Sequence, residues 1–152
     1  MTTYEQELER SGRIMFTVRG ISMRPLFRAG LDAISVKKCS AETLENLDIV
    51  LFKRKNANGE QYVLHRTVDR LPDGRFVIAG DNCSGADIVR PQDILGVVIS
   101  AQRGNKPIKL DGLRYALYKK LWCKPFKIRF KILHCRDKAR SAAGKIISLW
   151  RR

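Results

Sequence analysis

Short apolar segments separated by tight turns fill the first two thirds of the chain, and this spacing limits the possible folds most strongly. Each segment is rich in β-branched and aromatic residues, which favour strands. The turns between them hold chain-reversing residues, as at 56–59 (NANG) and 72–74 (PDG). Because strands and helices do not alternate, we predict a mainly β fold, a small antiparallel β domain. The predicted strands span residues 13–19, 31–38, 48–55, 60–70, 75–79 and 96–103.

Two short helical segments are expected beside these strands. Thr3 and Gln6 have the spacing of a capping box, so we predict a polar helix within residues 1–12 that closes near Gly12. Pro91 favours the first position of one helical turn over residues 91–95. Residues 80–90 are predicted to form a polar loop.

The charge of the chain is concentrated at its C-terminal end. Lys and Arg number 30 against 15 Asp and Glu, a formal net charge of +15. Residues 1–102 contain 14 basic and 13 acidic residues, whereas residues 103–152 contain 16 basic and 2 acidic residues. We therefore predict a near-neutral β domain over residues 1–104 and a basic, partly helical C-terminal extension over residues 105–152.

Within the extension, the apolar spacing changes along the chain. Leu113, Leu117 and Leu121 recur at helical spacing. After Pro125, apolar and basic residues alternate over residues 126–132, which favours a strand, although pairs four residues apart also allow a helix. Residues 139–152 are predicted to form a short basic helix.

The sequence also limits the compartment and the cofactors. No run approaches the roughly 20 apolar residues that span a bilayer, and the N-terminus lacks the form of a secretory signal. We therefore expect a protein that is cytoplasmic or peripheral at a membrane. The four cysteines lack zinc spacing and are expected to be free thiols. We expect no metal and no organic cofactor.

Three segments place polar residues where core or turn residues are expected. The first is Gly20-Ile21-Ser22-Met23-Arg24-Pro25, a constrained turn after a strand. Such a turn can direct the Ser22 hydroxyl outward and offer backbone N–H groups to an oxyanion. The plainer alternative is that Ser22 caps a helix.

The other two segments contain a histidine and two carboxylates. His65 lies in the middle of the strand predicted over residues 60–70, and its imidazole can accept a proton near neutral pH. Asp81 and Asp87 lie in the glycine-containing loop that follows the next strand. The plainer alternatives are a buried histidine bonded to a carbonyl and carboxylates that only cap turns or bind a metal.

In order and content, these three segments resemble the signal peptidase superfamily of serine peptidases. The turn with Ser22 resembles the nucleophile box, and the strand with His65 resembles the histidine-type branch found in endoplasmic-reticulum, archaeal and sporulation signal peptidases. The resemblance covers roughly residues 19–98. It implies that Ser22 is the nucleophile, His65 the general base and Asp87 the carboxylate that orients His65. Asp81 matches the Gly-Asp-Asn aspartate, which serves the loop or shares the orienting role.

The chain departs from that superfamily at two points. The 21 residues before Ser22 are polar, whereas the family usually has an N-terminal transmembrane anchor there. Gly20 stands where many members place a serine hydroxyl, so donation to an oxyanion would come from backbone amides such as that of Ser22.

We therefore expect a serine endopeptidase that cleaves a signal, leader or precursor peptide with small residues before the scissile bond. Two other functions stay open at this point, a non-catalytic membrane- or partner-binding module and a self-cleaving repressor-type regulator. The cationic residues 103–152 favour an anionic membrane surface as a partner. An acidic protein or peptide is the next alternative, ahead of a merely solvated tail, and nucleic acid is not the expected partner.

Overall fold

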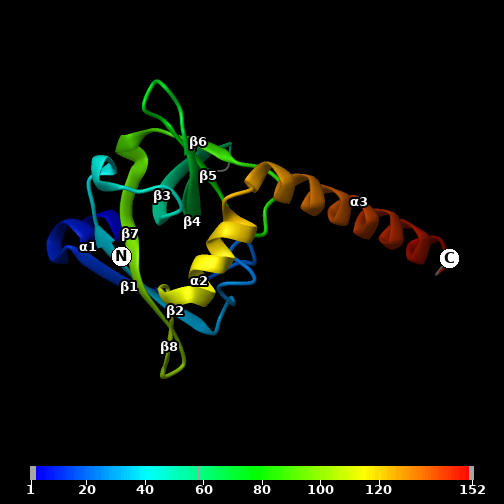
Figure 1. Ribbon diagram of the computed structural model, residues 1–152, viewed down its shortest axis with the longest axis horizontal. Helices are drawn as coiled ribbons and strands as arrows, with labels where there is room; N and C mark the ends of the chain where they lie inside the picture. The colour runs from blue at the N-terminus through cyan, green and yellow to red at the C-terminus, as the bar shows by residue number, and fades with distance from the viewer. Residues whose placement is uncertain (1–2, 58, 151–152) are drawn as a thin grey trace.

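The chain forms one antiparallel sheet, with a helical segment that crosses it and then leaves it (Figure 1). The computed structural model describes residues 3–57 and 59–150, and the side chains of residues 3–57 and 59–143. The sheet order is β1-β2-β7-β3-β4-β5-β6, with β8 paired to β7. The strands are β1 Arg13–Thr17, β2 Asp32–Lys38, β3 Ile49–Asn56, β4 Gly59–Arg70, β5 Phe76–Ala79, β6 Asp87–Val89, β7 Ile94–Arg103 and β8 Lys106–Ile108. The helices are α1 Tyr4–Ser11, α2 Gly112–Tyr118 and α3 Phe126–Trp150.

The predicted antiparallel β class is confirmed, and two further strands join it. β6 lies inside the segment predicted as a polar loop and pairs with β5. β8 follows a turn at Gly104 and pairs with β7. Short turns of 3₁₀ helix at Ala41–Thr43 and Pro91–Asp93 complete the element list, and the latter confirms the predicted helical turn. Asn58, in the predicted hairpin turn, lies outside the described residues.

The middle of the sheet is apolar on both faces. In β3, Ile49, Val50, Leu51 and Phe52 are all buried in succession. Such an unbroken run fits a strand covered on both sides, since an alternating pattern would expose every second side chain. Two core clusters result: one packs around Phe27 and Ile34, and the other packs around Phe52 and Ile78.

The N-terminal helix forms as predicted. The Thr3 side chain accepts from the Gln6 backbone while the Gln6 side chain accepts from the Thr3 backbone. Gly12 closes the helix at a φ of 70°, in the left-handed region that a side chain disfavours. Leu8 is the buried contact that fixes α1 to the sheet.

The strand favoured over residues 126–132 is wrong, because this segment begins the long helix α3. The backbone N–H groups of Ile128 and Arg129 both donate to the Pro125 carbonyl, so the helix starts directly after the proline. In the helix, Arg129 and Leu133 are buried, whereas Ile128 and Ile132 are exposed. The residues that alternate in the sequence of this segment therefore lie on different faces of a helix and not on the two faces of a strand.

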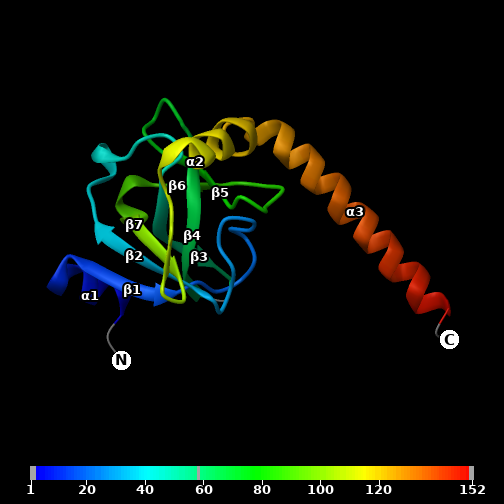
Figure 2. The same cartoon turned by 60° about the horizontal axis from the view of Figure 1, so that its bottom comes forward.

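The helical segment continues α2 through a π-helical turn, Lys119–Cys123, and then α3 projects away from the sheet (Figure 2). The helix predicted over residues 139–152 is continuous with α3 as far as Trp150, and Arg152 lies outside the described residues. Within the described part of the chain, no helix is both long and apolar enough to cross a bilayer. Cys39, Cys83, Cys123 and Cys135 are free thiols.

Candidate active site

The turn that carries Ser22 is anchored by the apolar residues on either side of it. Gly20 takes a φ of 73°, which lets the chain turn sharply after β1. Met23 and Phe27 are buried in the core and pull the turn against the sheet. Ser22 itself is half-buried, and its Oγ has no hydrogen-bond partner among the residues described. The hydroxyl is therefore not used as a helix cap.

The loop after β5 lies directly against this turn. The backbone N–H of Asn82 donates to the Ser22 carbonyl at 2.7 Å, and the Asn82 side-chain amide donates to the Ile21 carbonyl at 3.1 Å. A Cβ atom placed on Gly80 would come within 2.7 Å of the Ser22 carbonyl oxygen and 3.1 Å of His65 Cδ2. Gly80 thus lies between Ser22 and His65, and its missing side chain permits their approach.

His65 and Asp87 come from strands on either side of β5 and meet in front of it. His65 lies in β4 and is 7% exposed, while Asp87 is the first residue of β6. His65 Nδ1 lies 3.6 Å from Asp87 Oδ2 and has no hydrogen-bond partner in the described part of the chain. At this distance the two groups are beyond hydrogen-bond reach and form an ion pair only when His65 is protonated.

The surroundings of His65 favour its protonated form. Burial alone would lower the pKa of His65, because it removes water from the charged ring. Contacts with the Asp87 carboxylate and the Cys83 thiol outweigh burial, so the pKa of His65 is held above its ordinary value. The ring is therefore a base that binds a proton readily and is neutral only at somewhat higher pH.

Asp87 is correspondingly held in its charged form. Its contact with His65 lowers the pKa of Asp87, and Arg54 lowers it further against partial burial. Arg54 Nη1 donates to both carboxylate oxygens at 3.2 Å. A carboxylate fixed between an arginine and a histidine keeps its charge and can hold one ring orientation.

Asp81 has a different environment beneath the loop. Its carboxylate is fully buried and accepts two hydrogen bonds from Arg66, at 2.9 and 2.8 Å. The Tyr118 hydroxyl donates to the same carboxylate at 2.8 Å. These partners occupy both oxygens, and no contact joins Asp81 to His65 among the described residues. The carboxylate is placed to hold the loop and not the histidine.

The C-terminal segment closes over this buried ion pair. Trp122 Nε1 donates to the Asp81 carbonyl at 2.9 Å, and the Tyr115 hydroxyl accepts from Arg66 at 3.0 Å. Arg129 is 1% exposed and donates to the Gly80 carbonyl at 3.5 Å. Because Gly80 and Asp81 begin the loop that follows β5, α2 and the start of α3 form part of the support for that loop.

Ser22, His65 and Asp87, which the resemblance implies as a catalytic triad, all line one cleft of about 660 Å³. The walls combine polar and apolar surface, and α3 contributes Arg136, Asp137 and Arg140. Arg136 Nη1 also donates to Asn82 Oδ1 at 2.5 Å, which ties the projecting helix to the loop. The cleft is therefore bounded by the turn, the loop and the helix.

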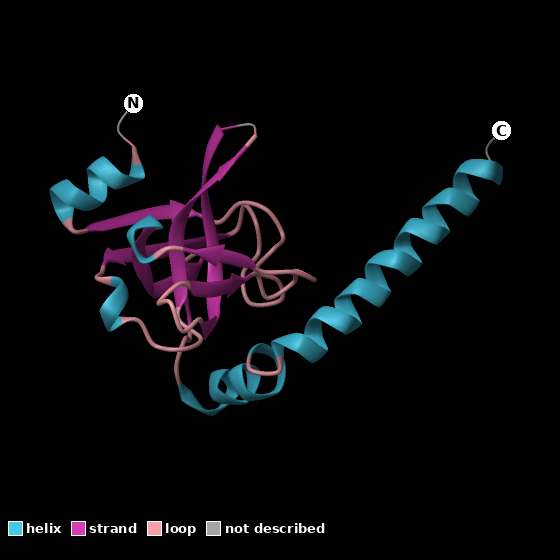
Figure 3. Cartoon of the chain, turned by 90° about the horizontal axis from the view of Figure 1, so that it is seen from above, coloured by secondary structure: helices cyan, strands magenta, loops and turns pink. Residues whose placement is uncertain are grey.

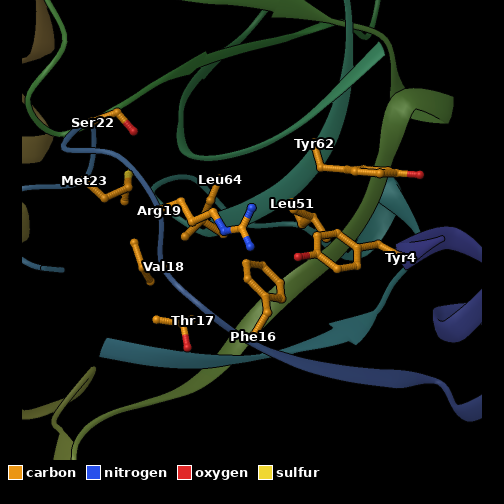
Figure 4. A pocket seen from close by; sticks show the side chains of 10 residues that line it. All are labelled: Tyr4, Phe16, Thr17, Val18, Arg19, Ser22, Met23, Leu51, Tyr62 and Leu64. Atoms are coloured by element: carbon orange, nitrogen blue, oxygen red, sulfur yellow. The ribbon is translucent and has the colours of Figure 1, made fainter. Parts of the chain in front are cut away.

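A smaller apolar pocket of about 100 Å³ begins at Ser22 and runs toward α1 (Figure 4). Its wall is mostly aromatic and aliphatic, and Ser22 lies at one end in the close-up view. Ser22 lines both hollows, so a chain lying across it can reach into each. The lining side chains are Tyr4, Phe16, Thr17, Val18, Arg19, Ser22, Met23, Leu51, Tyr62 and Leu64.

The site contains residues to which the sequence analysis assigned no role. Cys83 lines the cleft and lies beside His65, Arg54 fixes Asp87, and Arg66 neutralises Asp81. Arg66 directly follows His65 and Cys83 follows the Gly-Asp-Asn segment, so both lay within the motifs. No sequence pattern marks Arg54 as a site residue, because only the pairing of the strands brings β3 close to Asp87.

The arrangement can activate a hydroxyl and transfer a proton. Ser22 and His65 line the same cleft, and no hydrogen bond joins Ser22 Oγ to His65 among the described residues. When a neutral imidazole comes within reach of a serine hydroxyl it can remove the proton, and a carboxylate near Nδ1 stabilises the imidazolium that forms. Within the part of the chain that the structure describes, no group of three or more His, Cys, Asp or Glu side chains is arranged to hold a metal ion. Comparison with family models, with curated proteins and with solved structures gave no match for this chain.

Proposed function

We propose that this chain is a serine endopeptidase with Ser22, His65 and Asp87 as its reacting set. One observation carries the proposal: three residues from a turn and from strands β4 and β6 border one cleft, with the Asp87 carboxylate 3.6 Å from His65 Nδ1. The free Ser22 hydroxyl and the displaced pKa of His65 support it, since perturbed titration in a cleft is typical of functional sites.

In the proposed reaction, His65 takes the proton from Ser22 as Oγ attacks the scissile carbonyl carbon. The resulting imidazolium is stabilised by Asp87 and returns the proton to the leaving amine, which breaks the peptide bond. The acyl group now on Ser22 Oγ is attacked by a water molecule, from which His65 again accepts the proton. Release of the acid restores the serine hydroxyl, so no other reactant is consumed.

Charge on the tetrahedral oxygen needs donors, and the turn is the nearest source. Gly20 has no side-chain hydroxyl to offer, so the proposed donors are backbone N–H groups of the turn, that of Ser22 among them. The turn is held by the contact of Asn82 with the Ser22 carbonyl, which fixes the backbone that carries these groups.

The proposed substrate is a signal, leader or precursor peptide that lies across Ser22. The resemblance implies small side chains just before the scissile bond. The apolar pocket on one side of Ser22 supports an aliphatic contact. On the other side Arg136 is paired with Asp137, and Arg140 supports an acidic or carboxylate group. A peptide with both features has complementary contacts in both hollows.

A serine-directed fluorophosphonate probe tests the proposal without a known substrate. We expect wild type to be labelled on Ser22, and Ser22→Ala to fold normally and lose labelling by at least about 10³-fold. Ser84→Ala is the matched control, because Ser84 lines the same cleft and is exposed. Its labelling should equal that of wild type.

The same experiment separates the competing functions. Labelling on Cys83, retained in Ser22→Ala and lost in Cys83→Ser, would assign the nucleophile to the thiol beside His65 and overturn the role of Ser22. If the wild-type protein is folded and the probe does not label it, the result would favour a non-catalytic membrane- or partner-binding module. Fragments that appear in pure wild type on a gel time course, and not in Ser22→Ala, would favour the self-cleaving regulator.

A further inference from the structure

The outer faces of α2 and α3 carry large aliphatic side chains that nothing in the described chain covers. Five such residues lie within the segment 113–132 and are between 46% and 76% exposed. Single exposed aliphatic residues are normal on a protein surface, but a group along one segment marks an interaction surface. We name this group the apolar ridge; it consists of Leu113, Leu117, Leu121, Ile128 and Ile132.

The ridge follows from the helix geometry. Leu113 and Leu117 in α2 are four residues apart, as are Ile128 and Ile132 in α3, so each pair lies one turn apart on one face of its helix. Leu121 lies in the π-helical turn between the two helices. The opposite faces are already used: Tyr115 and Tyr118 contact the Arg66–Asp81 pair, and Arg129 contacts the Gly80 carbonyl. The ridge therefore points away from the body, and the views in Figures 2 and 3 show both helices on the outside of the sheet.

Basic side chains are interleaved with the ridge. Only two acidic residues, Asp111 and Asp137, occur in residues 103–152. The exposed basic residues along the same segment are Arg114, Lys120, Lys124, Lys127 and Lys131. Long basic side chains can extend to phosphate groups while the aliphatic side chains between them enter an apolar layer.

We propose that the apolar ridge and its flanking basic residues dock this protein on an anionic lipid surface. A bilayer interface offers negative headgroups beside acyl chains, which matches exposed cationic and aliphatic side chains along one segment. Duplex nucleic acid would attract the basic residues through its phosphates but would leave the five aliphatic side chains in water. The combination along this segment therefore favours lipid over nucleic acid.

The inserting residues differ from the large aromatic ones that the tail sequence displays. Trp122 is half-buried and bonded to the Asp81 carbonyl, so its indole is part of the support for the loop. Phe126 and Phe130 are half-buried and lie edge-to-face, 5.6 Å between ring centres. The exposed aliphatic residues are thus the ones free to enter lipid. The side chain of Trp150 lies outside the described residues.

Docking through the ridge would bring the cleft close to the lipid. Arg136 and Arg140 of α3 line the cleft, and α3 also carries Ile128 and Ile132 of the ridge. One helix therefore belongs to both surfaces. This part of the proposal holds whether the cleft is catalytic or only binds a ligand.

Vesicle co-sedimentation of the full chain tests the proposal. We expect wild type to sediment with phosphatidylserine-containing vesicles, weakly with phosphatidylcholine alone, and to retain part of its binding at about 0.5 M salt, where screening removes most of the electrostatic attraction. The triple variant Leu117→Gln, Leu121→Gln and Ile128→Gln keeps the charge and residues compatible with a helix. It should bind at least about tenfold more weakly and lose the salt-resistant part.

The matched control changes two aliphatic residues that are as exposed but lie on the body. Met15 and Leu31 are 65% and 61% exposed, so Met15→Gln with Leu31→Gln should bind as wild type does. Unchanged thermal midpoints show that each variant is folded. Wild type that ignores phosphatidylserine vesicles and binds duplex DNA or an acidic peptide would overturn the proposal. So would a ridge variant that binds vesicles as tightly as wild type.

Discussion

Asp81 begins the loop after β5 and Asp87 follows that loop as the first residue of β6, and the surroundings of the two carboxylates differ. Asp81 is enclosed with Arg66 and Tyr118, whereas Asp87 contacts His65 and Arg54 at the cleft. The resemblance implies Asp87 as the partner of His65; Asp87 contacts His65, and no contact joins Asp81 to His65 among the described residues. The orienting role itself stays a proposal, which the titration of His65 can test.

The rate of probe labelling should rise with pH as His65 loses its proton. Since Asp87 and Cys83 raise the pKa of His65 against burial, the midpoint should lie above the ordinary value of about 6.5. Asp87→Asn removes the largest raising contact, so we expect its midpoint at lower pH and its rate at least about 10²-fold lower. The measurement is the labelling rate between pH 5 and 9. A midpoint that does not move in Asp87→Asn would contradict the assignment.

Stability should show the same linkage with a defined sign. The raised pKa of His65 means that its protonated form is favoured in the folded chain. This stabilising contribution is therefore complete below the unfolded pKa and is lost as pH rises through the folded one.

Gly80 tests how closely the loop approaches the serine turn. In Gly80→Ala the new Cβ would meet the Ser22 carbonyl and Cys83 Sγ, each at 2.7 Å, so backbone must move. We expect a loss of about 1–3 kcal/mol in the free energy of unfolding and slower labelling of Ser22. Gly85→Ala is the matched control, because its Cβ would meet nothing within 4 Å. Equal effects of the two changes would show that close approach is not the reason for glycine at position 80.

At the scale of elements, the helical segment after β8 packs against the loop through polar contacts. Tyr115 and Tyr118 of α2 and Trp122 of the π-helical turn each bond to the Arg66–Asp81 pair or its backbone. Burial of that pair is tolerated because the Arg66 and Asp81 charges are matched and hydrogen-bonded to each other. The segment that carries most of the positive charge is thus also part of the support for the site.

Tyr118→Phe measures one of these contacts without disturbing the packing. The variant loses the hydroxyl that donates to Asp81 at 2.8 Å, and we expect about 1.5–3 kcal/mol less free energy of unfolding, as for hydrogen bonds to charged groups. Tyr62→Phe is the control, since its hydroxyl makes an exposed 3.4 Å contact with Glu5 and should matter by less than about 0.5 kcal/mol. Chemical denaturation gives both values. Similar losses of unfolding free energy in the two variants would mean that the Tyr118–Asp81 hydrogen bond contributes no more than an exposed contact.

At the scale of the whole molecule, the β domain and the C-terminal segment are energetically connected. The contacts of the segment with the loop extend from Tyr115 to Arg136, and Arg140 is the last residue that lines the cleft. Removal of the segment would leave Arg66 and Asp81 open to water and would take away the hydrogen bonds to Gly80 and Asp81. The loop that holds Asp87 would then lose its support.

Two shortened chains test this connection. A chain ending at Lys109 should be less stable than the full chain and should lose Ser22 labelling, because it lacks Tyr118, Trp122 and Arg129. A chain ending at Ala143 keeps every contact just named and should retain stability and labelling. Thermal melting and probe labelling of both report the result. Full labelling of the Lys109 chain would show that the β domain supports its site alone.

Much of the fold was predictable, because it depends on local chemistry. Strand-forming residues between turn residues gave the limits of most strands, and Thr3, Gln6 and Gly12 marked the ends of α1. The three segments around Ser22, His65 and Asp87 were also visible, since residue type and order alone identify them. These features can be predicted without knowing which segments contact one another in the folded chain.

The remaining features depend on which segments meet, and no local pattern contains that. Residues 126–132 alternate like a strand, but a helix lets Leu133 be buried and lets the Arg129 guanidinium reach the Gly80 carbonyl. Partners for Asp81 come from β4 and α2, and the partner for Asp87 comes from β3, far away in the chain. Charges can be buried only where opposite charges and donors converge, and the pairing of strands and docking of helices alone bring them together.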